Sequence, residues 1–152
     1  MQLSFCLPSI EATSGHELCF LSHPNYDRRL SCNIFGHIWM DGKWKGWEVW
    51  RFIKDDSGDF IITSWTHDQK VLCSDGDGRV YTVNMKDLIE EGRLKSQQWK
   101  IINHSTSHGV RIQSVTSFGV AKASNGLDNG LEGIKLDEPS NNLPLCAWRM
   151  WA

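Results

Sequence analysis

Three evenly spaced tryptophans constrain this chain of 152 residues more than any other feature. Trp50, Trp99 and Trp148 stand 49 residues apart, and each is followed by a basic residue and then a hydrophobic one. Self-similarity at such a period indicates a fold assembled from copies of one unit. Recurring indoles in strand context are core material, because each buries a large apolar area. We therefore expect one domain over 1–152, built from copies at about 13–56, 57–106 and 107–152.

Further columns recur upstream of each tryptophan, in steps of 42 and then 50 residues: Leu18, Phe60 and Val110; Phe20, Ile62 and Ile112; Ser22, Ser64 and Ser114. We expect these serine hydroxyls to bond neighbouring backbone. Between the first two copies the offset is 42 at Trp39 and Tyr81 but 49 at the tryptophans, so the second copy carries seven extra residues within 85–96. That stretch contains helix formers and a glycine, which predicts a short helical turn in a surface loop.

Hydrophobic and polar residues alternate with period two inside the second copy. The runs 60–63, 71–73, 80–83 and 99–102 read as four strands, and the turn over 74–78 is rich in Asp and Gly. Three such copies predict about twelve short strands in an all-β fold. A propeller needs at least four blades, so a closed threefold barrel is the architecture that remains.

The repeat pattern resembles that of the β-trefoil proteins, in which three repeats form a six-stranded barrel capped by three hairpins. Among these proteins, the pattern looks most like the fascin-like repeats of actin-crosslinking proteins. The shared features are hydrophobic columns followed by Ser, then Leu, then Gly-Xaa-hydrophobic and Trp-Xaa-hydrophobic. Gln97-Gln98-Trp99 is similar to the Gln-Xaa-Trp signature of ricin-type lectin repeats, whereas the first and third copies have Glu48 and Cys146 instead of the first glutamine. The third copy also has 118–121, Phe-Gly-Val-Ala, where the others have Leu30 and Leu72.

Composition argues against several functional classes. Sixteen Lys and Arg against eighteen Asp and Glu give a net charge of -2, so we expect no nucleic-acid partner. No apolar run is long enough to span a bilayer, and we expect no membrane insertion. Five cysteines without a Cys-Xaa-Xaa-Cys pair, and a start that lacks a basic signal region, favour reduced thiols in a cytoplasmic protein. The six histidines are scattered, and motifs for a nucleophile or a phosphate loop are missing, so we expect no enzyme, metal or cofactor.

The segment 43–47, Lys-Trp-Lys-Gly-Trp, has no counterpart in the other copies. The shared core does not require Trp44 or Trp47, so both are candidate ligand-binding rings, although they could equally cover the bottom of the barrel. Trp39 and Tyr81 are further candidates, because each lies one residue from an inward-facing side chain and should point outward.

Polar residues of the turns could supply the hydrogen bonds of a sugar site: Asn33, Asp75, Asp77, Asn125, Asp128 and Asn129. The resemblance to lectin-like trefoils implies an acidic or amide group beside an aromatic platform, but tight turns also favour Asn and Asp. We expect a binding module for carbohydrate. The alternatives are a fascin-like domain that binds actin or a scaffold protein, and a protease inhibitor that acts through an exposed loop.

Overall fold

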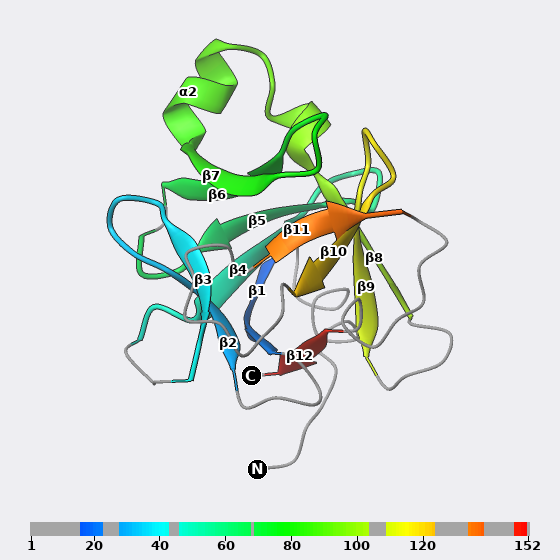
Figure 1. Ribbon diagram of the computed structural model, residues 1–152. Helices are drawn as coiled ribbons and strands as arrows, with labels where there is room; N and C mark the ends of the chain where they lie inside the picture. The colour runs from blue at the N-terminus through cyan, green and yellow to red at the C-terminus, as the bar shows by residue number, and fades with distance from the viewer. Residues whose placement is uncertain are drawn as a thin grey trace.

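The computed structural model describes residues 16–22, 28–42, 46–67, 69–103, 109–123, 134–138 and 148–151, and nearly all of the elements are strands (Figure 1). The first copy contains β1 (His16–Ser22), β2 (Arg29–Cys32), β3 (Ile38–Asp41) and β4 (Val49–Lys54). The second contains β5 (Phe60–Ser64), β6 (Lys70–Ser74), β7 (Val80–Asn84), α2 (Met85–Glu90), the 3-10 helix η1 (Lys95–Gln97) and β8 (Trp99–Asn103). The third contains β9 (Val110–Ser114), β10 (Val120–Ala123), β11 (Ile134–Asp137) and β12 (Arg149–Trp151). The predicted four strands per copy are confirmed.

Six strands, two from each copy, form a barrel. β1 pairs with β4, β4 with β5, β5 with β8 and β8 with β9, all antiparallel. A bridge joins Val110 of β9 to Trp148 beside β12, and β12 pairs back onto β1. The ring of strands therefore closes, as the threefold pattern predicted.

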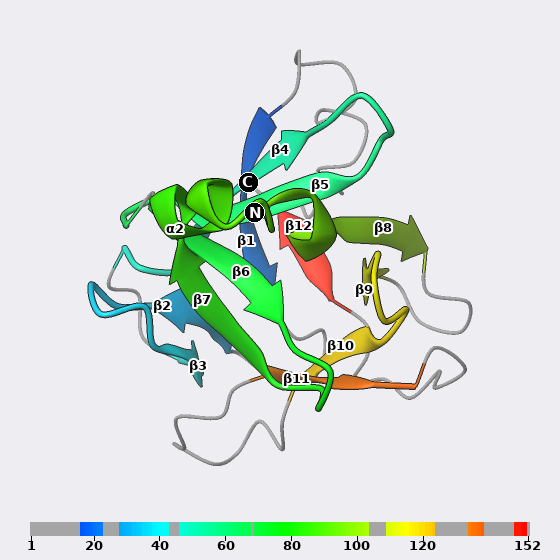
Figure 2. The ribbon, with the colours of Figure 1, turned by 90° about the horizontal axis from the view of Figure 1, so that it is seen from above.

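The other six strands form the hairpins β2–β3, β6–β7 and β10–β11. Figure 2 shows these hairpins as neighbours, seen from above. The hydroxyl of Thr82 on β7 donates to the carbonyl of Gly36 in the β2–β3 turn at 2.5 Å. The backbone N–H of Leu136 on β11 donates to the carbonyl of Gly78 in the β6–β7 turn at 2.7 Å. Each of these two turns is thus tied to the hairpin of the next copy.

The three recurring tryptophans are fully buried, which confirms their predicted role in the core. Their indole N–H groups donate to one equivalent carbonyl in each copy: Trp50 to Leu30 at 2.8 Å, Trp99 to Leu72 at 3.0 Å and Trp148 to Ala121 at 2.9 Å. Ala121 therefore stands where the other copies have leucine. The third copy differs there in its side chain while keeping the backbone hydrogen bond.

Serines at the strand ends close turns, as predicted. The Ser64 hydroxyl accepts from the backbone N–H of His67 at 3.1 Å, and the Ser114 hydroxyl accepts from Thr116 and Ser117 at 3.3 Å each. The strand that ends at Ser22 is described, but its side chains are not. Backbone bonding accounts for the two described hydroxyls.

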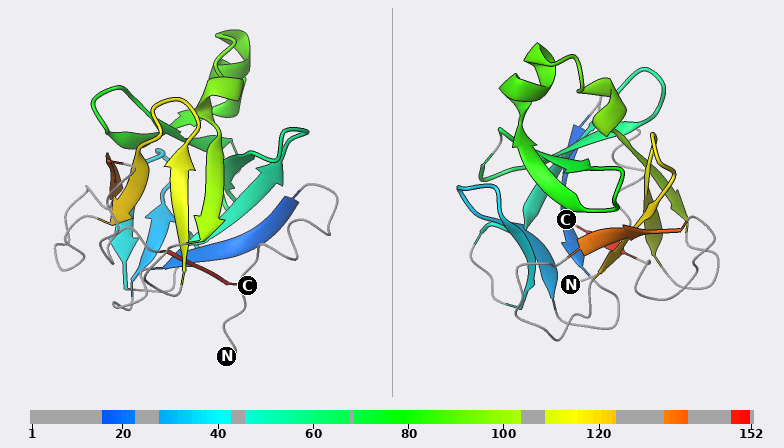
Figure 3. Two further views of the ribbon diagram at one scale, coloured as in Figure 1. Left: turned by 90° about the vertical axis from the view of Figure 1, so that its right-hand side faces the viewer. Right: turned by 45° about the horizontal axis from the view of Figure 1, so that its top comes forward.

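The extra residues of the second copy lie at the surface as predicted, but they also add a packing contact that the sequence did not predict. α2 and η1 confirm the helical turn, and α2 stands above the β6–β7 hairpin (Figure 3). Leu88 of α2 is fully buried against Val71 and Cys73, which forms a second hydrophobic cluster outside the barrel. The reason is that the outward-facing residues of β6 and β7 are themselves apolar. Among the residues described, no helix has the length and apolar character needed to cross a membrane.

Candidate functional site

Two of the predicted site residues, Trp39 and Trp47, meet on the outside of the first copy. Trp39 lies on β3 between Ile38 and Met40, whose side chains are buried in the core. Its ring packs edge to face against Trp47, with ring centroids 6.1 Å apart and an interplanar angle of 81°. Both indoles are half-buried and neither belongs to the core cluster. Trp44 lies outside the described residues.

The turn that follows β5 completes this aromatic surface. The His67 ring lies 6.3 Å from Trp47, and the backbone N–H of Trp65 donates to the carbonyl of Val49 at 2.9 Å. The Thr66 hydroxyl donates to the carbonyl of Gly46, so the turn is fastened to the segment that carries Trp47. We call Trp39, Trp47 and His67 the aromatic shelf.

His67 was not among the residues predicted from the sequence. Its Nε2 atom is buried and has no hydrogen-bond partner among the described residues. A buried nitrogen left unpaired costs free energy. Only its position three residues after the recurring Ser64 could have marked it, and that position does not indicate a neighbouring indole.

Asn33 is committed to the β2–β3 turn. Its Oδ1 atom accepts from the backbone N–H groups of Phe35 and His37, both at 3.0 Å, and Gly36 takes a positive φ of 85°. The Phe35 and His37 rings lie 6.3 Å apart, and 76% of Phe35 is exposed. The amide oxygen predicted to hold a sugar therefore shapes a turn that presents an aromatic ring.

Asp75 does the same in the β6–β7 turn. Its Oδ1 atom accepts from the backbone N–H groups of Asp77 and Arg79 at 2.9 and 3.0 Å, and Oδ2 pairs with the Arg79 guanidinium at 2.8 Å. Desolvation opposes ionisation, but the hydrogen bonds and the positive charge of Arg79 outweigh it and lower the pKa of Asp75. Asp77 is exposed at the tip of the turn.

The remaining predicted residues do not join the shelf. Tyr81 packs against the hydrophobic cluster beneath α2. Three polar candidates lie outside the described residues: Asn125, Asp128 and Asn129. The structure thus brings Trp39 and Trp47 together and places Tyr81 elsewhere.

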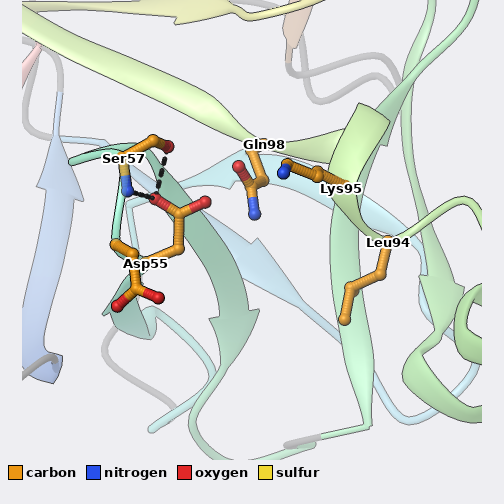
Figure 4. A pocket seen from close by; sticks show the side chains of 6 residues that line it. Asp55, Ser57, Leu94, Lys95 and Gln98 are labelled. Carbon is orange, nitrogen blue, oxygen red and sulfur yellow. Dashed lines mark hydrogen bonds between the residues drawn. The ribbon is translucent and has the colours of Figure 1, made fainter.

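An open cleft of about 560 Å³ lies between the β4–β5 turn and the segment before β8 (Figure 4). Six residues line it: Asp55, Asp56, Ser57, Leu94, Lys95 and Gln98. Asp55 closes the β4–β5 turn, because its Oδ1 atom accepts from the backbone N–H groups of Ser57 and Asp59 at 2.9 and 3.1 Å. Desolvation opposes ionisation, but hydrogen bonds, with the Ser57 hydroxyl foremost, lower the pKa of Asp55.

Gln97, the first residue of the Gln-Xaa-Trp signature, has a structural role. Its side-chain oxygen accepts from the backbone N–H of Ser74 at 2.9 Å. At the equivalent place in the first copy, the N–H of Cys32 donates to the carbonyl of Trp47 at 3.1 Å. Glu48, which replaces the glutamine, is buried and accepts from the N–H of Gly46 at 3.1 Å. The first copy therefore needs no glutamine, and the same hydrogen bond helps to place Trp47.

Solved structures with the same arrangement identify the fold. A designed threefold-symmetric protein, ThreeFoil, matches with a TM-score of 0.68 and 14% identity over 89% of this chain and 98% of its own. SeviL, solved with the asialo-GM1 saccharide, matches with a TM-score of 0.65 and 14% identity over 91% of this chain and 98% of its own. The chain is a β-trefoil.

Two longer proteins contain a similar part. The match to a mosquitocidal holotoxin spans 90% of this chain but 16% of the toxin, with 15% identity and a TM-score of 0.73. The chain also covers 32% of an endo-β-galactosidase from Clostridium perfringens, with 8% identity and a TM-score of 0.67. No protein-family model and no curated protein matches the sequence.

The three copies of the trefoil differ at the position of Trp39. Strand register aligns Trp39, opposite Ser31, with Tyr81, opposite Cys73, and with Lys135, opposite Lys122. Tyr81 packs beneath α2, and the third copy has no ring at this position. Among these three aligned positions, only the first carries an indole outside the hydrophobic clusters.

Proposed function

We propose that this β-trefoil is a non-catalytic carbohydrate-binding module whose ligand lies against the aromatic shelf. The Trp39–Trp47 pair carries the proposal, because the two indoles pack edge to face outside the core cluster and each keeps part of its ring at the surface. Ligand sites combine an apolar surface with a few placed polar groups, and Trp is suited to both because its ring is apolar and its N–H is a donor. The apolar face of a sugar ring stacks on such a surface.

The structural comparisons support a saccharide ligand. SeviL was solved with a bound saccharide, and the match spans 91% of this chain and 98% of SeviL. Function lies in sites grafted on a fold, so this similarity supports the class of ligand while the position rests on the shelf. The half-buried His67 ring beside Trp47 extends the apolar surface of the shelf.

The two described carboxylates with a resolved pKa shift do not match the general acid of a glycoside hydrolase. Glycoside hydrolysis uses one carboxyl group with a raised pKa as general acid and a second carboxylate across the bond. The pKa values of Asp55 and Asp75 are lowered instead, because the carboxylate oxygens of each accept hydrogen bonds within a turn. The buried carboxylate of Glu48 beside the shelf accepts from the N–H of Gly46. These carboxylates hold loops in shape.

A glycan array with three versions of the protein tests the proposal. Trp39→Ala should lose at least about tenfold in affinity, since an anchoring aromatic can contribute 2 kcal/mol or more to binding. Phe118→Ala is the matched control, because its ring is 53% exposed on the β9–β10 turn, across the barrel from β3 (Figure 1). Thermal unfolding should show both variants folded. Equal binding by Trp39→Ala and wild type would refute this site.

The competing interpretations are tested with the same preparation. A fascin-like domain should pellet with actin filaments while the array stays silent, and a protease inhibitor should suppress peptide hydrolysis. Either result without glycan binding would replace the carbohydrate proposal.

A further inference from the structure

We propose that the site is an elongated one that takes a linear oligosaccharide, with the tip of the β2–β3 hairpin as its far end. This inference rests on the proposed function and names the class of saccharide. The observation behind it is a line of rings longer than the shelf itself.

The rings follow one another at short intervals. Phe35 lies 6.3 Å from His37, Trp39 lies 6.1 Å from Trp47, and Trp47 lies 6.3 Å from His67. His37 directly precedes β3 and Trp39 lies on it, so their Cα atoms are about 7 Å apart if the chain is extended between them. A pyranose is about the size of one aromatic ring, so this line offers more surface than a single sugar can cover.

The conformation of the β2–β3 turn does not require the aromatic side chain of Phe35. Three of the described turns share one construction, with an Asx oxygen accepting two backbone N–H groups and a glycine at positive φ three residues later: Asn33–Gly36, Asp55–Gly58 and Asp75–Gly78. Their two tip residues are Asp56 and Ser57 in one case and Gly76 and Asp77 in another.

The β2–β3 turn alone among these three has an apolar tip, Ile34 and Phe35, which are 65% and 76% exposed. The same backbone is built elsewhere with polar residues, so the apolar tip is not required for folding. Exposed apolar side chains at such a place indicate a binding surface.

The turn is also rigid enough to serve as part of a site. Asn33 closes it with two hydrogen bonds, and the hydroxyl of Thr82 on β7 holds the Gly36 carbonyl from below. The backbone that carries Phe35 is therefore held in place, which reduces the entropy lost on binding. A long chain anchored on Trp39 and Trp47 reaches Phe35, whereas a short one does not.

The experiment compares two chain lengths on wild type and on two variants. Disaccharides and hexasaccharides of N-acetyllactosamine and of chitin type are arrayed, and the better-bound family is then titrated by calorimetry. Wild type should bind the hexasaccharide more tightly. Phe35→Ala should lose about threefold to tenfold for the hexasaccharide and stay within about twofold for the disaccharide, as one aromatic contact implies.

Phe118→Ala is the matched control, because its ring is exposed on the β9–β10 turn and is not part of this line of rings. It should bind both lengths like wild type. Equal affinity for both lengths, an equal loss by Phe35→Ala on both, or a loss by Phe118→Ala would overturn the elongated site while leaving carbohydrate binding in place. Wild type that binds no arrayed glycan would overturn the proposed function itself.

Discussion

Replacing Trp99 with phenylalanine tests the physical basis of the repeat. The indole is fully buried, and its N–H donates to the backbone carbonyl of Leu72, which is also fully buried, at 3.0 Å. Phenylalanine keeps an aromatic ring in the core but removes that donor. The Leu72 carbonyl is then left without its indole partner inside the barrel.

The expected cost follows from these two changes. An unsatisfied buried carbonyl costs about 1–3 kcal/mol. The smaller ring adds a residual cavity, and about 1 kcal/mol is typical of such a core change. The sum, about 2–4 kcal/mol, is a large part of the 5–15 kcal/mol that stabilises a typical domain. At this chain length it corresponds to a fall in Tm of roughly 5–15 °C.

Urea unfolding followed by far-ultraviolet circular dichroism measures this free energy. Trp65→Phe is the control, since its ring is 49% exposed, and it should change stability by less than about 1 kcal/mol. Trp148→Phe should resemble Trp99→Phe, because its N–H donates to Ala121 in the same way. Equal, small effects at all three positions would refute the assignment of these indoles to a hydrogen-bonded core.

Three further outcomes follow from the described residues. Burial raises the pKa of Cys32 to about 11 and that of Cys73 to about 12. Iodoacetamide at pH 8 should therefore label both thiols only when urea unfolds the protein. Mass spectrometry that finds either thiol labelled in the native protein would contradict this. The lowered pKa of Asp75 stabilises the fold above its unfolded pKa of about 3.9, and this contribution is lost as the pH falls through the lower folded value. Asp75→Asn, which can still close the turn, should therefore lose less stability than wild type as the pH falls below about 4, whereas identical acid-unfolding curves would argue against it. Because Trp39 has no exposed aromatic equivalent among the aligned positions, calorimetry should give one sugar site per chain, and a stoichiometry of three would contradict the comparison of copies.

Much of the fold was predictable because its causes are local. Alternation along 60–63 and 80–83 marks which side chains face inward, and the matched spacing of Trp50, Trp99 and Trp148 counts the copies. The inserted residues were located correctly. Their role was missed, because the burial of Leu88 depends on the apolar outer face of β6 and β7, which forms only after these strands pair.

The site was less predictable for a similar reason. Asn33 and Asp75 suit both a sugar site and a tight turn, and only their hydrogen-bond distances show that the turn uses them. His67 carried no signal of its own. Its place beside Trp47 follows from the pairing of β4 with β5, which brings the turn after β5 back to the segment before β4.

The amino-acid sequence by itself determined three four-stranded copies and the inward tryptophans, since strand alternation and repeat spacing are properties of neighbouring residues. Only the tertiary structure decided which outward rings face solvent and meet. Trp39 and Tyr81 occupy the same strand position, yet one lies beside Trp47 and the other packs beneath α2. An outward direction is set within a strand, whereas what covers that direction is set by elements that pack on it from elsewhere in the chain.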